Sequence, residues 1–420
     1  MKKRVKIACL ALVFLLVISG ALMAGGGSQS SGSPSGKTKL QFWTWLSNED
    51  AVAEFNRQET QYEVEHVQMA HADINNKLIV ALSANAGAPD IATTTHRYFS
   101  LHGDTGKLYD MSSIVRDVFS QFPDSLQKLV TVNGKICALP VDISPAVLWY
   151  RRDIFTKYGI KTPVETWNQY NEIARTLKRD GVYVMPIFNP AGTWGSNAIA
   201  MFLGTRGGNI FTPEGKVIRN NKELEFVLNY FYTVNKEGYG ESLTFFTPEF
   251  WGELKSGNVA SWPMNMAEGA NIKRNMPELS GQWGVMPIPR WDDKTEKLTG
   301  FWGGTVLMVP DQGSNQEASA RFVKWFASTE EGQLAASRTW NAVPAFSPVY
   351  KNSFYTQGDP YFGGDCTYAM INPSTPFYYY DWAIVEKILG EQIDLMFADR
   401  ITPAQAREAI ENNIAAEAKR

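Results

Sequence analysis

The chain has 420 residues, of which 44% are hydrophobic and 20% charged, a composition typical of a soluble globular protein with two or three domains. Its formal net charge of −3 argues against nucleic acid and anionic membranes as partners. The 4 histidines and 3 cysteines form no CxxC or HExxH motif, so we expect no metal site, and nothing indicates another cofactor.

Residues 1–24 have the pattern of a signal peptide. Four cations precede an apolar run at 7–18, which is too short to span a bilayer comfortably, and small residues follow it. We therefore expect export to the periplasm or the cell exterior, with an uncleaved anchor as the alternative. The window 21–28 contains no cysteine that could accept a lipid. Residues 25–37, rich in glycine and serine, predict a flexible tether.

Strand and helix patterns alternate through the first hundred residues. Strands are expected at 39–45, 62–68 and from 89 to 92, and a helix with one apolar face at 73–86. Ser47 is positioned to cap another helix after the first strand. This alternation predicts a mainly parallel sheet covered by helices.

The later elements are predicted from the same patterns and from capping residues. Thr166 with Gln169 three residues later forms a capping-box pattern, and Pro248 suits the first position of a helix. A polar, aromatic loop is expected at 92–103. Further strands are expected at 182–188, 259–262 and 283–288, and a glycine turn followed by a buried strand at 302–310. Further helices are expected at 114–130, 166–178, 224–238, 248–256, 314–326, 329–338, 377–397 and 402–417.

Two apolar strands flank a polar pair within the stretch 133–178. The first strand stops at Pro140, the second covers 146–150, and Asp142 and Ser144 lie between them. Polar side chains at strand ends beside a crevice are where open α/β folds bind ligands. Asp142 is the strongest candidate, because a carboxylate between apolar strands needs a partner. The alternative to ligand binding is a structural role, in which Asp142 forms a salt bridge or a hydrogen bond to a neighbouring turn.

These motifs resemble family 1 of the extracellular solute-binding proteins of ABC importers, the group that contains the maltodextrin-binding proteins. The most specific part of the resemblance is NGKICALPVD followed by LWYRRDIFTKYGIKTPVETWNQYNEIA. Further matching pieces, in the expected order, are FWTW, GAPDIAT, GNVASWPM, WGVMPIP with GFWGGTVLMVP, and EASARFVKWFAS.

The resemblance implies an α/β protein with the two-lobed type II periplasmic binding protein fold. Each lobe would be a mainly parallel sheet flanked by helices, and three hinge crossings would join the lobes around a clamped ligand. We place the first lobe at 38–143 plus 298–339, and the second lobe at 144–297 plus 340–420.

The segments that should border the cleft combine aromatic rings with planar polar groups. A pyranose stacks its C–H faces on rings and pairs its hydroxyls with carboxylates, amides or guanidinium groups. Thr94 stands where the maltodextrin binders carry a Trp, which weighs against stacking of long oligosaccharides. The candidate ligand-binding residues are Trp45, Asn48, Thr94, His96, Arg97, Asp142, Ser144, Asn189, Trp194, Asn265, Glu268, Trp302, Gly303, Trp340, Tyr379 and Tyr380.

Several candidates also have a structural interpretation. A Trp in such segments is often part of the core, His96 could be an ordinary loop histidine, and Glu268 could cap the helix that follows it. Cys137 and Cys366 could be two free thiols, which we expect, or a disulfide.

Together, these features predict a monomeric binding protein that is not an enzyme. It would capture a monosaccharide or small oligosaccharide and deliver it to a membrane permease. One alternative is a secreted carbohydrate-active enzyme, in which Asp142 and Glu268 would have to flank one glycosidic bond. Another is a binding protein for a non-sugar solute such as a polyamine, whose site would need more carboxylates than the candidates supply.

Overall fold

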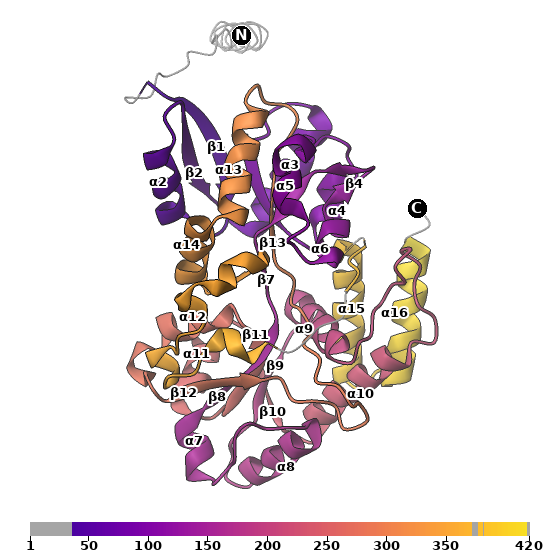
Figure 1. Ribbon diagram of the computed structural model, residues 1–420. Helices are drawn as coiled ribbons and strands as arrows, with labels where there is room; N and C mark the ends of the chain where they lie inside the picture. Colours follow the sequence, from indigo (N-terminus) through magenta and orange to yellow (C-terminus); the bar gives the residue numbers. More distant parts are fainter. Residues whose placement is uncertain (1–35, 372–376, 381, 418–420) are drawn as a thin grey trace, which may run out of the picture.

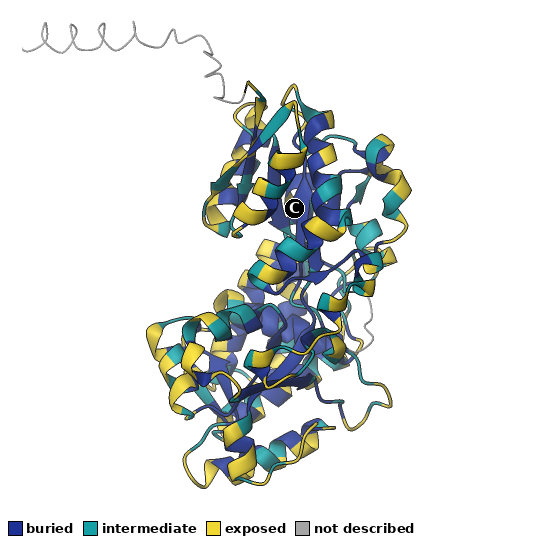
Figure 2. Ribbon diagram, turned by 60° about the vertical axis from the view of Figure 1, so that its left-hand side comes forward, coloured by how far each residue is buried: buried dark blue, intermediate teal, exposed yellow. Residues whose placement is uncertain are grey.

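The computed structural model describes residues 36–371, 377–380 and 382–417, which form two lobes stacked end to end (Figures 1 and 2). The predicted signal peptide and nearly all of the predicted tether lie outside these residues. In the described ranges, no helix combines the length and apolar character needed to cross a bilayer.

The first lobe is built on a five-stranded sheet in the order β2-β1-β3-β13-β6. β1 pairs in parallel with β2 and β3, whereas β13 runs antiparallel to both of its neighbours. The strands are β1 (Thr38–Thr44), β2 (Tyr62–Gln68), β3 (Ile91–Thr95), β6 (Ala138–Pro140) and β13 (Thr305–Met308).

Helices cover both faces of this sheet (Figure 1). Aromatic side chains pack between the helices and the sheet. For example, Phe322 of α13 packs edge-on against Phe42 of β1, with 5.4 Å between the ring centroids. The helices are α2 (Glu49–Gln58), α3 (His71–Ala84), α4 (Phe99–Gly103), α5 (Ser112–Phe119), α6 (Asp124–Leu129), α13 (Gln316–Ser328) and α14 (Glu330–Trp340). Ala345, Phe346 and Val349 also pack into this core, although we expected the second lobe to begin at residue 340.

The second lobe repeats this arrangement of strands. β8 (Ala146–Arg151) pairs antiparallel with β11 (Ser261–Asn265) and β12 (Trp283–Pro287). β9 (Met185–Phe188) and β10 (Gly240–Leu243) form a parallel pair, which a parallel bridge between Tyr183 and Val259 joins to β11. β9, β10, β11 and β12 therefore run in one direction and β8 in the other.

In each lobe the reversed strand is the one that the chain enters from the other lobe. β8 comes directly after the chain leaves the first lobe, and β13 directly after it returns. These two strands run away from the boundary between the lobes, so their neighbours run toward it. The carboxyl ends of most strands in both lobes therefore face the boundary, where open α/β sheets bind ligands.

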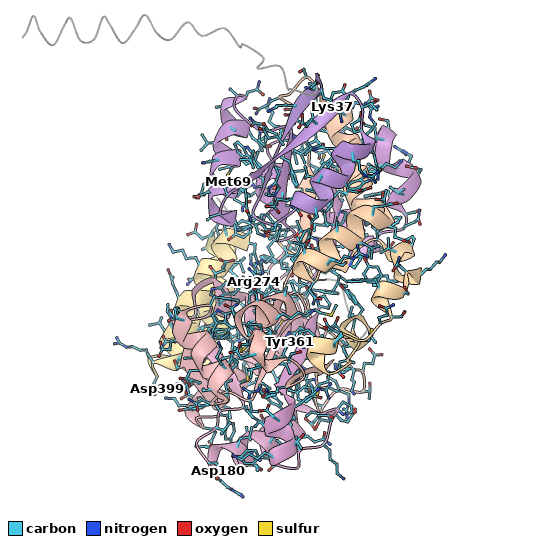
Figure 3. All side chains as sticks on the ribbon, turned by 90° about the vertical axis from the view of Figure 1, so that its left-hand side faces the viewer. Lys37, Met69, Asp180, Arg274, Tyr361 and Asp399 are labelled. Atoms are coloured by element: carbon cyan, nitrogen blue, oxygen red, sulfur yellow. The ribbon has the colours of Figure 1, made fainter. Side chains whose placement is uncertain are left out.

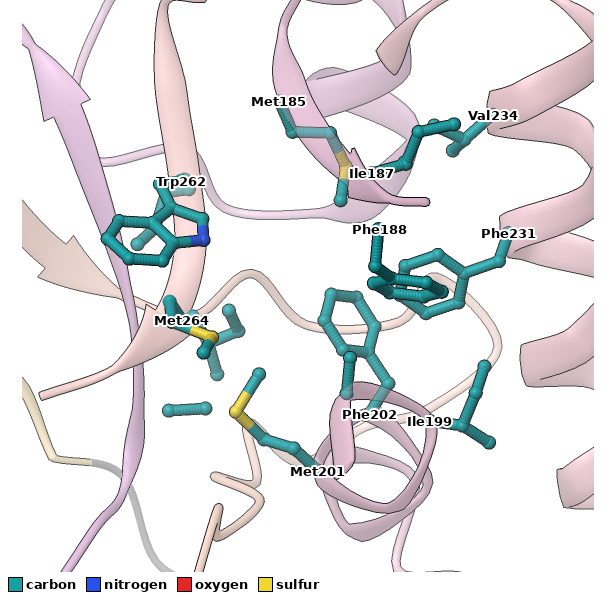
Figure 4. Close-up of a cluster of buried hydrophobic side chains, with 14 of the residues drawn as sticks. Met185, Ile187, Phe188, Ile199, Met201, Phe202, Phe231, Val234, Trp262 and Met264 are labelled. Atoms are coloured by element: carbon teal, nitrogen blue, oxygen red, sulfur yellow. The ribbon is translucent and has the colours of Figure 1, made fainter. Parts of the chain in front are cut away.

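The core of the second lobe is rich in aromatic and methionine side chains (Figure 4). Phe202 of α9 meets Phe231 of α10 edge-on at 4.7 Å between ring centroids. The helices of this lobe are α7 (Arg152–Lys157), α8 (Trp167–Lys178), α9 (Gly192–Thr205), α10 (Lys222–Lys236), α11 (Pro248–Ser256), α12 (Glu268–Asn275), α15 (Trp382–Phe397) and α16 (Pro403–Glu417).

Short elements complete the chain. The strands β4 (Thr131–Val132) and β5 (Lys135–Ile136) form a hairpin, and β7 (Asp142–Ile143) pairs with β14 (Val343–Pro344) at the boundary between the lobes. Single turns of 3-10 helix lie at Pro277–Leu279, Ser347–Lys351, Ser353–Tyr355, Pro360–Phe362 and Thr367–Met370. Cys137 is buried and Cys366 half-buried, and both are free thiols.

Several local predictions are confirmed. Thr166 and Gln169 make both hydrogen bonds of a capping box, and Pro248 occupies the first turn of α11 behind the capping Thr247.

Three others are wrong. Ser47 does not cap α2, which begins at Glu49. Residues 92–103, which we predicted to form a loop, instead contain most of β3 and the helix α4. β3 continues as far as Thr95, where it is still paired with β13. The predicted helix 114–130 is two helices, and Pro123 lies between them because proline disrupts an α-helix.

Candidate functional site

Three backbone segments cross between the lobes side by side. β7 lies in the middle, and Pro344 of β14 pairs with Asp142 on one side of it. On the other side, the Ser144 N–H donates to the Gly303 carbonyl at 2.9 Å, and the Trp302 N–H donates to the Ser144 carbonyl at 2.8 Å. The hinge is thus a small sheet whose central strand carries the polar pair seen in the sequence.

Glycine is required at position 304 because three segments meet there. A Cβ atom at Gly304 would stand 2.2 Å from the Asp142 carbonyl oxygen and 2.5 Å from the His96 ring. At Gly303 the φ angle is +132°, which side chains other than glycine rarely adopt. The two glycines let the second crossing lie directly against the first.

A cavity of about 650 Å³, here called the inner cavity, opens between the lobes at this hinge. Nine of the candidate residues line it: Trp45, Arg97, Asp142, Ser144, Trp194, Asn265, Glu268, Trp302 and Trp340. The other residues of its wall are Leu46, His71, Ala72, Asn75, Asn76, Thr95, Tyr98, Thr193, Asn197, Ala267, Gly304, Thr305, Ala383 and Glu386.

Asp142 combines a structural contact with a place on the cavity wall. Its Oδ1 accepts the backbone N–H of Thr305 at 2.8 Å, so its carboxylate ties the first crossing to the second. The residue is 2% exposed, and burial raises the pKa of this carboxyl to about 7, although hydrogen bonds from Thr305 oppose that shift. Near neutral pH it can therefore carry a proton and donate a hydrogen bond.

Glu268 is a second buried carboxyl on the opposite lobe. Its Oε2 accepts from the Asn271 amide at 2.7 Å, and its Oε1 accepts from Asn265 at 3.4 Å. Burial raises its pKa to about 7. The residue at the N-cap of α12 is Ala267, which makes no side-chain cap, so Glu268 does not act as the N-cap of this helix.

Aromatic rings from both lobes wall the inner cavity. On the first lobe, His71 packs edge-on between Trp45 and Tyr98, with ring centroids 4.7 Å and 5.4 Å apart. At the hinge, Trp302 stacks on Trp194 of α9 at 5.6 Å and an interplanar angle of 21°. All four of these Trp and Tyr rings are half-buried, so each keeps some exposed surface.

Arg97 is the cation of the inner cavity. It is 8% exposed, its Nη1 donates to the Trp302 carbonyl, and its Cζ lies 5.7 Å from the Trp302 ring centroid. Its Nε has no hydrogen-bond partner among the described residues. Burial and the Arg97 charge together lower the pKa of His71 to about 4, so this histidine is neutral at physiological pH.

Within the described ranges, no group of His, Cys, Asp and Glu side chains is arranged to hold a metal ion.

Residues 47–333 match the family of bacterial extracellular solute-binding proteins, and the match covers more than half of the chain. The chain belongs to this family.

Known relatives of this solute-binding protein agree with that assignment. The arabinooligosaccharide-binding protein of Bacillus subtilis is 25% identical over 83% of this chain and 81% of its own length. The mannitol-binding protein of Pseudomonas aeruginosa is 24% identical over 68% of this chain and 66% of its own length.

Solved structures confirm the type II periplasmic binding protein fold. The ABC transporter associated binding protein of B. animalis subsp. lactis, in complex with β-1,6-galactobiose, superposes with a TM-score of 0.76 at 18% identity. That match covers 91% of this chain and 98% of the other. The galacto-N-biose-/lacto-N-biose I-binding protein of Bifidobacterium longum gives 0.76 at 19% identity, with 91% and 98% covered.

Seven of the candidate residues of this solute-binding protein do not line the inner cavity. Asn48 and Thr94 are buried in the first lobe, where they bond to Thr44 and Asn75. The remaining five are His96, Gly303 and Tyr379, which line a separate cavity of about 130 Å³, Asn189, which is exposed, and Tyr380, whose hydroxyl donates to the Pro213 carbonyl.

Nine residues with polar side chains on the wall are absent from the sequence candidates: His71, Asn75, Asn76, Thr95, Tyr98, Thr193, Asn197, Thr305 and Glu386. His71 follows the carboxyl end of β2, so applying the strand-end argument to that strand would have found it, and Asn75 lies one helical turn later. Glu386 interrupts the apolar face that Trp382 and Leu389 form on α15, a pattern visible in the sequence. Asn197 gives no such signal.

Proposed function

We propose that this solute-binding protein captures a monosaccharide or small oligosaccharide in the inner cavity and delivers it to the membrane permease of an ABC importer. The observation that carries the proposal is the wall of this cavity. Half-buried rings from both lobes line it together with buried carboxyl, amide and guanidinium groups. A sugar, with apolar C–H faces and a rim of hydroxyls, matches both kinds of surface.

The volume of the inner cavity fits this size of ligand. About 650 Å³ lies within the range of small-molecule sites, which extends to about 1,000 Å³. The names of the relatives point the same way, because they bind arabinooligosaccharides or mannitol, and the solved structures are described with galactobiose and lacto-N-biose.

Buried polar groups without partners support a hydroxyl-rich ligand. The Asn197 amide nitrogen and the Arg97 Nε both lie in buried side chains on the cavity wall, and neither has a hydrogen-bond partner among the described residues. Unsatisfied buried donors are costly, by about 1–3 kcal/mol each. We propose that ligand hydroxyls accept these hydrogen bonds.

Ligand capture would be coupled to closure of the lobes. Trp45, Tyr98 and Trp340 belong to the first lobe, and Trp194, Asn265 and Glu268 to the second. A sugar that contacts both sets binds the closed form better than the open form, and this difference in affinity shifts the equilibrium. We propose that the protein acts as an exported monomer, and that the permease recognises the closed form.

We also propose that binding is not followed by cleavage. Asp142 and Glu268 are both buried with raised pKa values, as an acid catalyst can be, but each already binds protein donors. Incubation with oligosaccharides should leave them intact, and chromatographic detection of shorter products would contradict this part of the proposal.

A sugar panel read out by thermal shift and tryptophan fluorescence tests the function. A ligand present at a hundred times its dissociation constant should stabilise the protein by about 2.7 kcal/mol. Its binding should also change the emission of the Trp residues in the cavity. A matched panel of amino acids, polyamines and carboxylates serves as the control. The proposal fails if one of these classes shifts the melting temperature while no sugar does.

A further inference from the structure

A second cavity of about 910 Å³, here called the outer groove, adjoins the inner cavity. Trp45, Leu46 and Trp340 line both spaces, so these side chains separate the two. The outer groove also lies between the lobes, because Arg338 reaches it from α14 of the first lobe and Lys273 and Arg274 reach it from α12 of the second. Figure 3 shows Arg274 between Met69 of the first lobe and Tyr361 of the second.

The outer groove carries an excess of positive charge. Its described lining includes Lys273, Arg274 and Arg338 but a single carboxylate, Asp359. That carboxylate already pairs with Lys273. Within the described residues, Arg274 and Arg338 form no salt bridge, and Arg274 instead donates through Nη2 to the Asn271 side chain at 2.8 Å.

The position of the two arginines in their helices does not explain this charge fully. Both lie in the last turn of a helix, where a cation interacts favourably with the helix dipole. That effect would be satisfied on any solvated surface. Here the two guanidinium groups instead belong to opposite lobes and line one interlobe space, so an anion bound in that space could interact with both of them.

The inner cavity carries no such excess of positive charge. Its described lining includes the carboxyl groups of Asp142, Glu268 and Glu386 and one cation, Arg97. Protonated or ionised, these carboxyl groups can form hydrogen bonds with sugar hydroxyls, whereas none of them attracts an anionic group. A ligand that spans both spaces would therefore place its neutral end in the inner cavity and its acidic end in the outer groove, past the rings of Trp45 and Trp340.

We propose that the ligand of this protein is an acidic oligosaccharide, with a carboxylate of the uronic acid type held between Arg274 and Arg338. This inference rests on the proposed function. It adds that the sugar is negatively charged and that its acidic end lies in the outer groove. The carboxylate bridges the two lobes, so the charge contributes to closure as well as to affinity.

Matched pairs of sugars that differ only in their carboxylates test the inference. The pairs are cellobiose with cellobiouronic acid, which has one carboxylate, and α-1,4-linked galactobiose with α-1,4-linked digalacturonic acid, which has two. All four are titrated by calorimetry at low and high salt. We expect the acidic member of at least one pair to bind more tightly. Its advantage should shrink as salt rises, because these cations are exposed to solvent.

Arg338→Gln is the sharper variant, because Arg274 is hydrogen-bonded to Asn271, which itself donates to Glu268 in the inner cavity. It should reduce the affinity for the acidic sugar about two- to fivefold more than the affinity for its neutral partner, the range of exposed ion pairs. Arg338→Lys keeps the charge and should keep the salt-dependent preference. Arg116→Gln, an exposed change on α5 outside both spaces, should leave both affinities unchanged.

Two results overturn the inference. The first is that both members of each pair bind equally well, that their affinities do not depend on salt, and that Arg338→Gln affects both equally. This result would leave the proposed sugar function intact. The other is that no member of the pairs binds. The wider sugar panel then decides separately whether the proposed function also fails.

Discussion

The inner cavity and the outer groove lie on either side of Trp45 and Trp340, yet they use charge in different ways. In the inner cavity, Arg97 and Asp142 are 8% and 2% exposed, and each is bonded to the backbone of the second crossing. In the outer groove, Arg274 and Arg338 are exposed. The burial of a group, more than its charge, therefore sets the cost of removing it.

The largest effect is expected from removing a ring of the inner cavity. Trp302→Ala should weaken sugar binding by about 2 kcal/mol, roughly thirtyfold, because it deletes a ring that Trp194 and Arg97 both contact. Calorimetry measures the change. Trp251→Ala removes an equally half-buried Trp outside both spaces, so it should lower stability and leave affinity intact. Equal losses in the two variants would contradict a binding role for the Trp302 ring.

A second effect separates the two roles of Asp142. Asp142→Ala leaves the buried Thr305 N–H without its acceptor, and we expect it to lower the free energy of unfolding by about 1–3 kcal/mol. Asp142→Asn can retain an acceptor oxygen and should unfold nearly as the wild type does. Chemical denaturation of the ligand-free protein measures both. A wild-type stability in Asp142→Ala would show that the hinge does not depend on this bond.

The pH dependence of stability should reflect the buried carboxyls. Burial raises the pKa of Glu268 from 4.5 to about 7, so between these values the folded state keeps a proton that the unfolded state has lost. The free energy of unfolding should therefore fall as pH rises through this window and level off above it, at about 1.4 kcal/mol per pKa unit.

Glu268→Gln removes one of the two buried carboxyls whose pKa is raised to about 7, so the free energy of unfolding should fall less steeply with pH. Asp142 should account for the fall that remains. Melting temperatures measured from about pH 5 to pH 8 test the prediction. Arg338 is not among the groups that shift the pKa of either buried carboxyl, so Arg338→Gln should follow the wild-type curve. Parallel curves for Glu268→Gln and the wild type would mean that Glu268 does not titrate in this window.

The smallest effect is expected at a residue that the sequence placed in the site. Tyr380 is half-buried beside Pro213, far enough from both spaces that it lines neither. Tyr380→Phe should change sugar affinity less than about twofold, within the range of surface substitutions. A tenfold loss measured by calorimetry would show that the late aromatic run contacts the ligand after all.

The sequence by itself determined the local elements and the hinge. Caps such as Thr166 and the apolar periodicity of the helices depend on residues three or four positions apart, so they are visible in the chain. The same holds for Asp142 and Ser144, because a polar pair between two apolar strands predicts a strand end at a crevice.

Only the tertiary structure decided which side chains share one cavity. The Thr193 hydroxyl donates to Glu386 at 2.6 Å across 193 positions of sequence, and the Tyr98 hydroxyl reaches the same carboxylate across 288. Asn48 and Thr94 have the right chemistry in the right segments, yet they are buried against Thr44 and Asn75 and do not line the cavity. Local patterns specify the chemistry that a side chain offers, whereas packing between distant segments fixes where it points.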